Sequence, residues 1–307
     1  MTKKKKPIVR CPQSHLEHRM KFKNAFAFPF FLLAADVYAD LPLSLENIAP
    51  KQNHLKIGAS LTYFNSSSDV YRQGASTRFL TPQNTTIEIP GRLHNGRENS
   101  DVLYSNLNLQ YGLSANTEIY TGVGALWRQN RYNENGNYSS RNHNELSEIT
   151  VGVNQVLLRD GKNPMLTAKL ETSVVEKIRG KNVHGRSWFA GISAYKAIDP
   201  VVFSITTGYR FNFNNSTERR PGNYWIIRPG VSFAANDRTS FNVRLQWTGR
   251  QGDRIRSKKA NAFESSTHAT LGVGYAFSNQ TSLSADVQWN LSGDSGANAT
   301  LALQHRF

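Results

Sequence analysis

Charged side chains occur in this sequence at positions that alternate with apolar ones. A charge is costly in lipid but not in a water-filled interior, so these residues are expected to line a pore, where basic groups favour the passage of anions. The predicted pore-lining residues are Lys56, Glu118, Arg128, Glu148, Lys169, Glu171, Arg210, Arg244, Asp286 and Arg306. The alternative is that these charges pair across the interior and fill it, for instance Glu118 or Glu171 with Arg128.

Two histidines stand near residues with which they could do chemistry. His143 lies close to Glu145, and His268 lies close to Ser265 and Ser266. Neither arrangement has the spacing of a known nucleophile motif, and scattered residues do not define a catalytic triad without geometry. The sequence also has no metal-ligand cluster and no glycine loop that could hold a phosphate. We therefore expect a protein that is not an enzyme and that has no cofactor and no metal.

The composition fits a soluble globular protein poorly. A chain of 307 residues should bury a large core, yet only 38% of the residues are hydrophobic and strongly apolar runs are rare after Asn53. A transmembrane barrel looks this polar because each strand shows one side chain to lipid and the next to the lumen. The single cysteine, Cys11, precedes the apolar segment described next. The mature chain is therefore expected to have no thiol, which suits an oxidising periplasm.

The N-terminal segment has the features of a secretory signal peptide. Basic residues precede an apolar stretch at 25–35, and small residues at 37 and 39 place the expected cleavage between Ala39 and Asp40. The apolar stretch is shorter than the roughly 20 residues that a spanning helix needs, which argues against a permanent anchor. Either Met1 or Met20 is compatible with this interpretation as the start of the chain.

The signal peptide divides the chain into three expected parts. Residues 1–39 form a basic leader and signal peptide, residues 40–53 a periplasmic N-terminal segment, and residues 54–307 a transmembrane β-barrel. The formal net charge is +15 at pH 7. A basic mature surface suits anionic lipopolysaccharide or an anionic permeant, and nucleic acid is not expected as a partner in the outer membrane.

From His54 onward, alternating apolar and polar residues fill about twelve stretches that are separated by turns. This pattern is typical of an all-β, transmembrane, antiparallel up-and-down β-barrel. An even number of strands returns both ends of the barrel to the periplasm. The residues expected to face lipid, one from each stretch and here called the belt residues, are Leu61, Leu107, Val123, Val151, Leu170, Ile192, Ile205, Ile227, Val243, Leu271, Val287 and Leu301.

The connections between the stretches alternate in length, as the turns and outer loops of such barrels do. The longer, polar connections are expected at 65–100, 129–143, 178–184, 214–222, 249–264 and 292–297. The first of them contains two short β-like stretches, Val70-Tyr71 and residues 85–89. They could form a hairpin above the membrane, add two strands to make fourteen, or fold inward as a constriction.

Phe307 follows an alternating stretch at the end of the sequence. A C-terminal aromatic residue on a last strand resembles the signal that the barrel-assembly machinery reads, so Phe307 is predicted to be a membrane-assembly signal. The expected location is the outer membrane of a Gram-negative bacterium. The expected partners are outer-membrane lipid, lipopolysaccharide and the assembly machinery.

Several short strings resemble one family of outer-membrane barrels, named after the meta-pathway of phenol degradation and described as transporters. The strings are Ser44-Leu45-Glu46, residues 56–63, Tyr111-Gly112-Leu113-Ser114, residues 197–202, residues 220–223, Leu245-Gln246-Trp247 and residues 272–277. The resemblance covers nearly the whole mature chain. It implies an outer-membrane transporter, but the lysine-rich leader and basic loops depart from the family, so no aromatic substrate is inferred from its name.

Two functions from different classes follow. The first is a channel or transporter with a basic lumen that passes small solutes, or a pore associated with the export of surface proteins, since some such barrels are thought to serve export. The second is a plugged structural or adhesive barrel whose loops bind lipopolysaccharide or a partner protein. Conductance in lipid bilayers distinguishes the two.

Overall fold

The computed structural model describes most of the predicted barrel. The described residues are 50–69, 77–81, 84–89, 97–134, 137–178, 181–182, 187–214, 219–292 and 296–307. The predicted signal peptide, with its cleavage between Ala39 and Asp40, and residues 40–49 of the segment 40–53 lie outside them. No helix in the described residues is long and apolar enough to cross a membrane.

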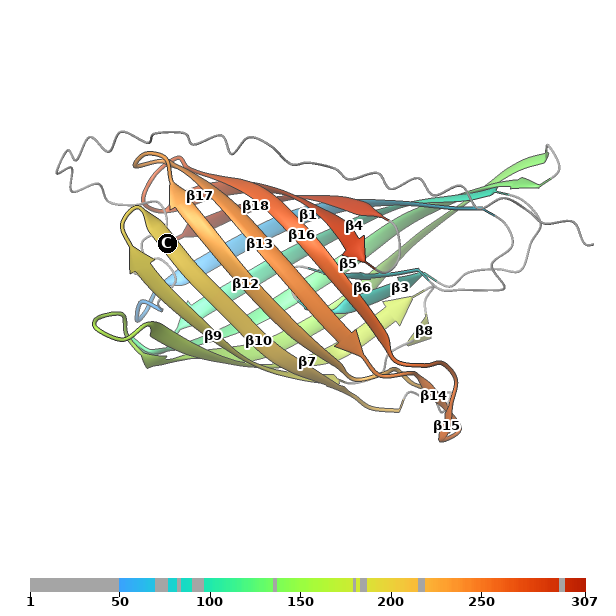
Figure 1. Ribbon diagram of the computed structural model, residues 1–307, viewed down its shortest axis with the longest axis horizontal. Coiled ribbons are helices and arrows are strands. Elements are labelled where there is room, and N and C mark those ends of the chain that lie inside the picture. The colour runs from blue at the N-terminus through green and yellow to red at the C-terminus, as the bar shows by residue number, and fades with distance from the viewer. Residues whose placement is uncertain are drawn as a thin grey trace, which may run out of the picture. The chain divides into compact units, whose positions relative to one another are not determined.

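Twelve long antiparallel strands form a closed barrel (Figure 1). They are β1 (Leu55–Asp69), β4 (Arg97–Gly112), β5 (Thr117–Glu134), β6 (Asn137–Leu158), β7 (Met165–Ile178), β9 (Ser187–Ile198), β10 (Val201–Asn212), β12 (Tyr224–Ala234), β13 (Thr239–Arg250), β16 (Glu264–Ala276), β17 (Thr281–Ser292) and β18 (Ala297–Arg306). Each pairs with the next one along the chain, and β1 pairs with β18. Closure leaves no unpaired strand edge in lipid, and the predicted fold class is confirmed.

The two faces of the sheet have opposite chemistry. All the belt residues point outward, with exposed fractions between 40 and 51%. Most of the buried side chains that line the inner face are polar or charged, for example Thr62, Asn106 and Thr150. An apolar outside around a polar inside is the reverse of a soluble protein, and it is the arrangement that a lipid environment requires.

Aromatic rings stand near both ends of the barrel wall. Near the long-loop end, the ring centroid of Tyr209 lies 4.4 Å from that of Phe211 and 4.5 Å from that of Trp225. Near the short-turn end, the rings of Tyr275 and Phe277 lie 5.1 Å apart. Amphipathic rings are favoured at the headgroup level of a bilayer, so these two girdles mark its two surfaces.

The chain ends beside its first barrel strand. The backbone N–H of Phe307 donates to the carbonyl oxygen of Leu55 at 2.8 Å. The ring of Phe307 contacts that of His305, with 4.5 Å between their centroids, and is 60% exposed. Its role as an assembly signal remains a prediction.

The prediction of a loop at 129–143 is wrong, because two strands extend through these residues. β5 and β6 stay paired from Gln129 and Asn142 up to Glu134 and Asn137. Backbone pairing does not need lipid, so a ladder can continue into water for as long as turn residues do not interrupt it. The short strands β8 (Lys181–Asn182), β11 (Arg219–Arg220), β14 (Arg254–Ile255) and β15 (Lys258–Lys259) occupy three other predicted loops.

The described part of the first long connection folds into the barrel. Its described part forms a hairpin of β2 (Thr77–Leu80) and β3 (Thr86–Ile89), here called the lumen hairpin, which does not join the barrel sheet. Of the three possibilities given by the sequence, the inward constriction is therefore the one found, while Val70-Tyr71 lie outside the described residues.

The lumen hairpin contacts inward-facing side chains of several barrel strands. Ile87 belongs to a buried cluster with inward-facing side chains of β1, β4 and β5, which are Phe64, Val102, Tyr104 and Leu126. Leu80 packs against a second cluster on β9 and β12, made of Phe189, Tyr224 and Ile226. The hairpin thus reaches from one part of the wall to another and narrows the lumen.

Candidate solute passage

The predicted pore-lining residues all lie on strands, at positions that alternate with outward-facing ones. Six of them are buried, namely Lys56, Glu118, Arg128, Glu148, Glu171 and Arg210. The other four are half-buried, namely Lys169, Arg244, Asp286 and Arg306. Their placement on the inner face agrees with the sequence pattern, and their effect on permeation remains a prediction.

Glu171 lies at the centre of a buried network, here called the Glu171 cluster. One carboxylate oxygen accepts a hydrogen bond from Arg210 Nη2 at 2.7 Å. The other accepts from Lys169 Nζ at 2.9 Å and from the hydroxyl of Tyr120 at 2.8 Å. The Glu171 and Arg210 side chains are each only 1% exposed. Charges this deeply buried are tolerated only when they are paired and hydrogen-bonded, as they are here.

Strand register explains how the Glu171 cluster assembles. Large side chains from neighbouring strands stand level with one another in a series here called the large row, with one glycine among them: Tyr120, Gly152, Glu171, Phe189, Arg210 and Tyr224. A Cβ at Gly152 would collide with the ring of Tyr120. The glycine therefore lets Tyr120 reach across β6 to Glu171.

The other inner carboxylates also have close partners. Glu118 accepts from Lys56 Nζ at 2.8 Å and from the amide of Asn154 at 3.0 Å. The hydroxyl of Tyr104 donates to Glu148. Much of the charge expected to make the lumen basic is thus neutralised locally.

The predicted partners of Arg128 are wrong. The carboxylate of Glu118 pairs with Lys56, and that of Glu171 pairs with Arg210 and Lys169. Glu118 lies near the start of β5, and Arg128 follows ten residues later, roughly 33 Å away along an extended strand. Strand register places ion-pair partners at the same or nearby levels of the barrel, which separation in the sequence does not reveal.

A second series of inward-facing positions carries only small residues. Strand pairing brings them level with one another from β1 through β18 to β12, and this small row consists of Ser60, Ala302, Ser284, Gly274, Ser240 and Ala234. Because these side chains are short, the inner face here leaves space where the large row leaves little.

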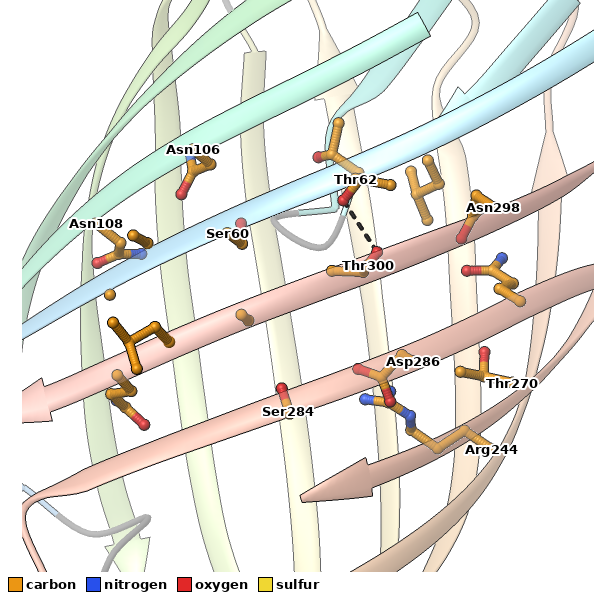
Figure 2. A pocket seen from close by; sticks show the side chains of 18 of the residues that line it. Ser60, Thr62, Asn106, Asn108, Arg244, Thr270, Ser284, Asp286, Asn298 and Thr300 are labelled. Carbon is orange, nitrogen blue, oxygen red and sulfur yellow. Dashed lines mark hydrogen bonds and ion pairs between the residues drawn. The ribbon is translucent and has the colours of Figure 1, made fainter. Parts of the chain in front are cut away.

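A polar cavity of about 320 Å³ lies against this part of the wall. Ser60, Ala302 and Ser284 of the small row line it, and Leu80 and Thr81 of the lumen hairpin also contribute. Figure 2 shows hydroxyl and amide side chains on neighbouring strands around it, with Thr62 and Thr300 joined by a hydrogen bond of 3.0 Å. Arg244 and Asp286 lie together in the same view, paired at 2.7 Å.

The lumen hairpin is fixed at its turn and at its first strand. Near the turn, Tyr224 donates to the carbonyl oxygen of Asn84, and Arg228 Nη2 donates to the side-chain oxygen of Asn84, both at 2.7 Å. On β2, Arg78 pairs with Glu264 at 2.8 Å and with Asp253 at 3.4 Å. The hairpin is therefore an integral part of the cavity wall.

Sequence reasoning missed two contributors to this site. Arg228 lies two residues after Ile226 and four after Tyr224, so the alternation of β12 places all three on the inner face. This alternation was a signal that could have identified Arg228. The turn residue Asn84 gave no such signal. Its φ of 61° is left-handed, which asparagine tolerates better than most residues, but that conformation is visible only in the structure.

The two histidine arrangements are short-range contacts along single strands. His143 Nε2 lies 3.2 Å from Glu145 Oε2, and His268 Nε2 lies 3.2 Å from Ser266 Oγ. In the described part of the chain, Nδ1 of His268 has no hydrogen-bond partner. A catalytic histidine would be oriented through that nitrogen, so the geometry gives no support to a triad here.

The closed barrel, its apolar outside and its polar inside define a bacterial outer-membrane β-barrel protein. The chain belongs to the family described as "MetA-pathway of phenol degradation", which matches residues 93–307. A search of curated proteins found no match.

The chain is similar to solved structures of other bacterial outer-membrane proteins. An outer membrane channel of Pseudomonas putida F1 is 11% identical, with a TM-score of 0.59 over 89% of this chain and 100% of that one. The toluene transporter TbuX of Ralstonia pickettii is 13% identical, with a TM-score of 0.47 over 84% of this chain and 90% of that one. At such low identity, the first of these similarities supports the fold alone.

Proposed function

We propose that the protein is an outer-membrane channel that passes small polar solutes between the lumen hairpin and the small row. The observation that carries this proposal is the cavity of about 320 Å³, which lies inside the barrel and is lined mainly by side chains with hydroxyl and amide groups. Such groups both donate and accept hydrogen bonds, so they can replace part of the water around a solute in transit.

The size of the cavity limits what can pass. It is at the lower end of the roughly 300 to 1,000 Å³ typical of small-molecule sites. A water molecule takes about 30 Å³ in the liquid, so the space corresponds to about ten waters. A small solute fits, whereas an exported polypeptide would need the lumen hairpin to leave its position. The small-solute function is therefore the one we propose over export.

A plugged structural barrel is the second candidate, and one observation favours it. The lumen hairpin is held at Asn84 and at Arg78, and the Glu171 cluster fills the lumen beside it. A hairpin so firmly held could close the lumen entirely. Adhesion through lipopolysaccharide or a partner protein, like contact with the assembly machinery, stays a prediction.

Single-channel recordings in planar bilayers test the two candidates. We expect small, stable conductance steps from the wild type. A variant in which a Gly-Ser linker replaces residues 77–89 should give conductance steps that are several-fold larger. In the matched control, a Gly-Ser linker replaces residues 254–259, an exposed part of an outer loop. This replacement should leave the conductance unchanged. A folded wild type that stays silent while the variant without the hairpin conducts would identify a plugged barrel.

A further inference from the structure

Arg228 differs in its partners from three other cations of the inner face. Lys56, Arg210 and Arg244 each pair with a carboxylate. Among the described residues, Arg228 has none, and its partners are neutral amide oxygens. Its Nε donates to Gln246 Oε1 at 2.8 Å, and its Nη2 donates to Asn84 Oδ1 at 2.7 Å.

The position of Arg228 places this uncompensated charge in the proposed passage. Arg228 lines the polar cavity together with Gln246, Thr270 and Thr81. Asn84, near the turn of the lumen hairpin, holds the guanidinium from one side, and Gln246 of β13 holds it from another. A second guanidinium, that of Arg244, lines the same cavity.

The chemistry of this arrangement selects an anion. A guanidinium has five N–H donors in a planar fork, and in the described residues two of them are used by the amide oxygens. The fork matches the two oxygens of a carboxylate. A half-buried cation without a counterion is unfavourable, so an entering carboxylate would relieve that cost while the amides keep the fork oriented.

We propose that Arg228 is a binding site for the carboxylate group of a small anionic solute in transit. Gln246 and Asn84 position the guanidinium, and the nearby hydroxyls of Thr270 and Thr81 serve the rest of the solute. This inference rests on the proposed channel function and names its substrate class. It also gives the lumen hairpin a second role, because Asn84 is part of the site.

Reversal potentials across a salt gradient test this site, with acetate as the probe. In potassium acetate, we expect the wild type to prefer acetate over potassium. The variant Arg228→Gln should lower that permeability ratio about tenfold, as expected for the loss of one charge-assisted hydrogen bond. Arg228→Lys keeps the charge but lacks the fork, and should give an intermediate ratio. The control Arg238→Gln removes an exposed charge from a short turn and should behave as the wild type does.

The outcomes separate this inference from the channel function. A conducting wild type whose ratio is unchanged in Arg228→Gln overturns the carboxylate site and leaves the channel function intact. A silent wild type overturns the channel function first. If inorganic phosphate is preferred over acetate and that preference depends on Arg228, the assignment to carboxylates is wrong. Heat-dependent gel mobility identifies folded protein, and Arg228→Lys provides the test if Arg228→Gln does not fold.

Discussion

The large row and the small row occupy the same inner face and arise from the same alternating pattern, yet they differ in what their side chains do. In the large row, Glu171 and Arg210 are buried and bonded to each other. In the small row, Ser60, Ala302 and Ser284 border a cavity. Side-chain volume and charge at one level of the barrel therefore decide whether that part of the lumen is filled or left open.

This difference suggests a division of labour within one lumen. The filled part satisfies its charges internally, so it can stabilise the barrel without involving a solute. The open part leaves hydroxyl and amide groups facing the cavity. β12 belongs to both rows, with Tyr224 near one end and Ala234 at the other, and Arg228 lies between them. Arg228, the proposed carboxylate-binding residue, thus lies where the filled and the open parts of the lumen meet.

The largest expected effect is a loss of stability from a substitution in the large row. Glu171→Gln removes the carboxylate that neutralises Lys169 and Arg210, leaving the buried Arg210 and the half-buried Lys169 without this counterion. We expect the free energy of unfolding to fall by about 3 to 5 kcal/mol. Urea unfolding in lipid vesicles, followed by gel mobility, measures it. Asp286→Asn breaks a more exposed pair and should cost about 1 kcal/mol or less. Equal losses would contradict the distinction between the two sides.

Adding one methyl group should also affect the two rows differently. Gly152→Ala forces Tyr120 away from Glu171, and overpacking of this kind costs about 1 to 3 kcal/mol. Gly274→Ala in the small row meets only the hydroxyl of Ser240, which can rotate, so its cost should be lower. The same unfolding assay compares them. A Gly274→Ala loss as large as that of Gly152→Ala would show that the small row is tightly packed too.

A bulky residue in the small row should reduce transport and leave stability nearly unchanged. Ala302→Phe places a ring in the cavity between Ser60 and Ser284. We expect a several-fold lower single-channel conductance. Ala299→Phe, on the outward face of the same strand, is the matched control and should conduct as the wild type does. Unchanged conductance in Ala302→Phe would place the passage elsewhere in the lumen.

The strands and their faces could be predicted because the alternation between lipid and lumen is a local property with a period of two residues. The belt residues needed no knowledge of strand pairing. The partners of Glu118 and Glu171 did, because they depend on how neighbouring strands are staggered around the whole barrel. The same stagger assembles the large and small rows from residues that are far apart in the sequence.

The sequence allowed the lumen hairpin to fold inward but could not choose this arrangement over the other two, for a different reason. Ile87 lies between the polar residues Thr86 and Glu88, as a lipid-facing residue would, so burial inside the barrel leaves no separate signature. The inward position of Arg228 could have been predicted, because the alternation of β12 places it on the inner face. That its partners among the described residues are amides and not carboxylates is visible only in the three-dimensional structure.

The smallest expected effect is on the channel current, from a substitution where the large row contacts the lumen hairpin. Tyr224→Phe removes the hydroxyl that donates to the carbonyl oxygen of Asn84, and such a bond contributes about 0.5 to 1.5 kcal/mol. The hairpin should then fluctuate more, and the open-channel current should become noisier without a change in mean conductance. Tyr209→Phe, in the outer aromatic girdle, is the matched control. Quiet currents in Tyr224→Phe would mean that Arg228 and the hairpin's apolar contacts hold it without that hydrogen bond.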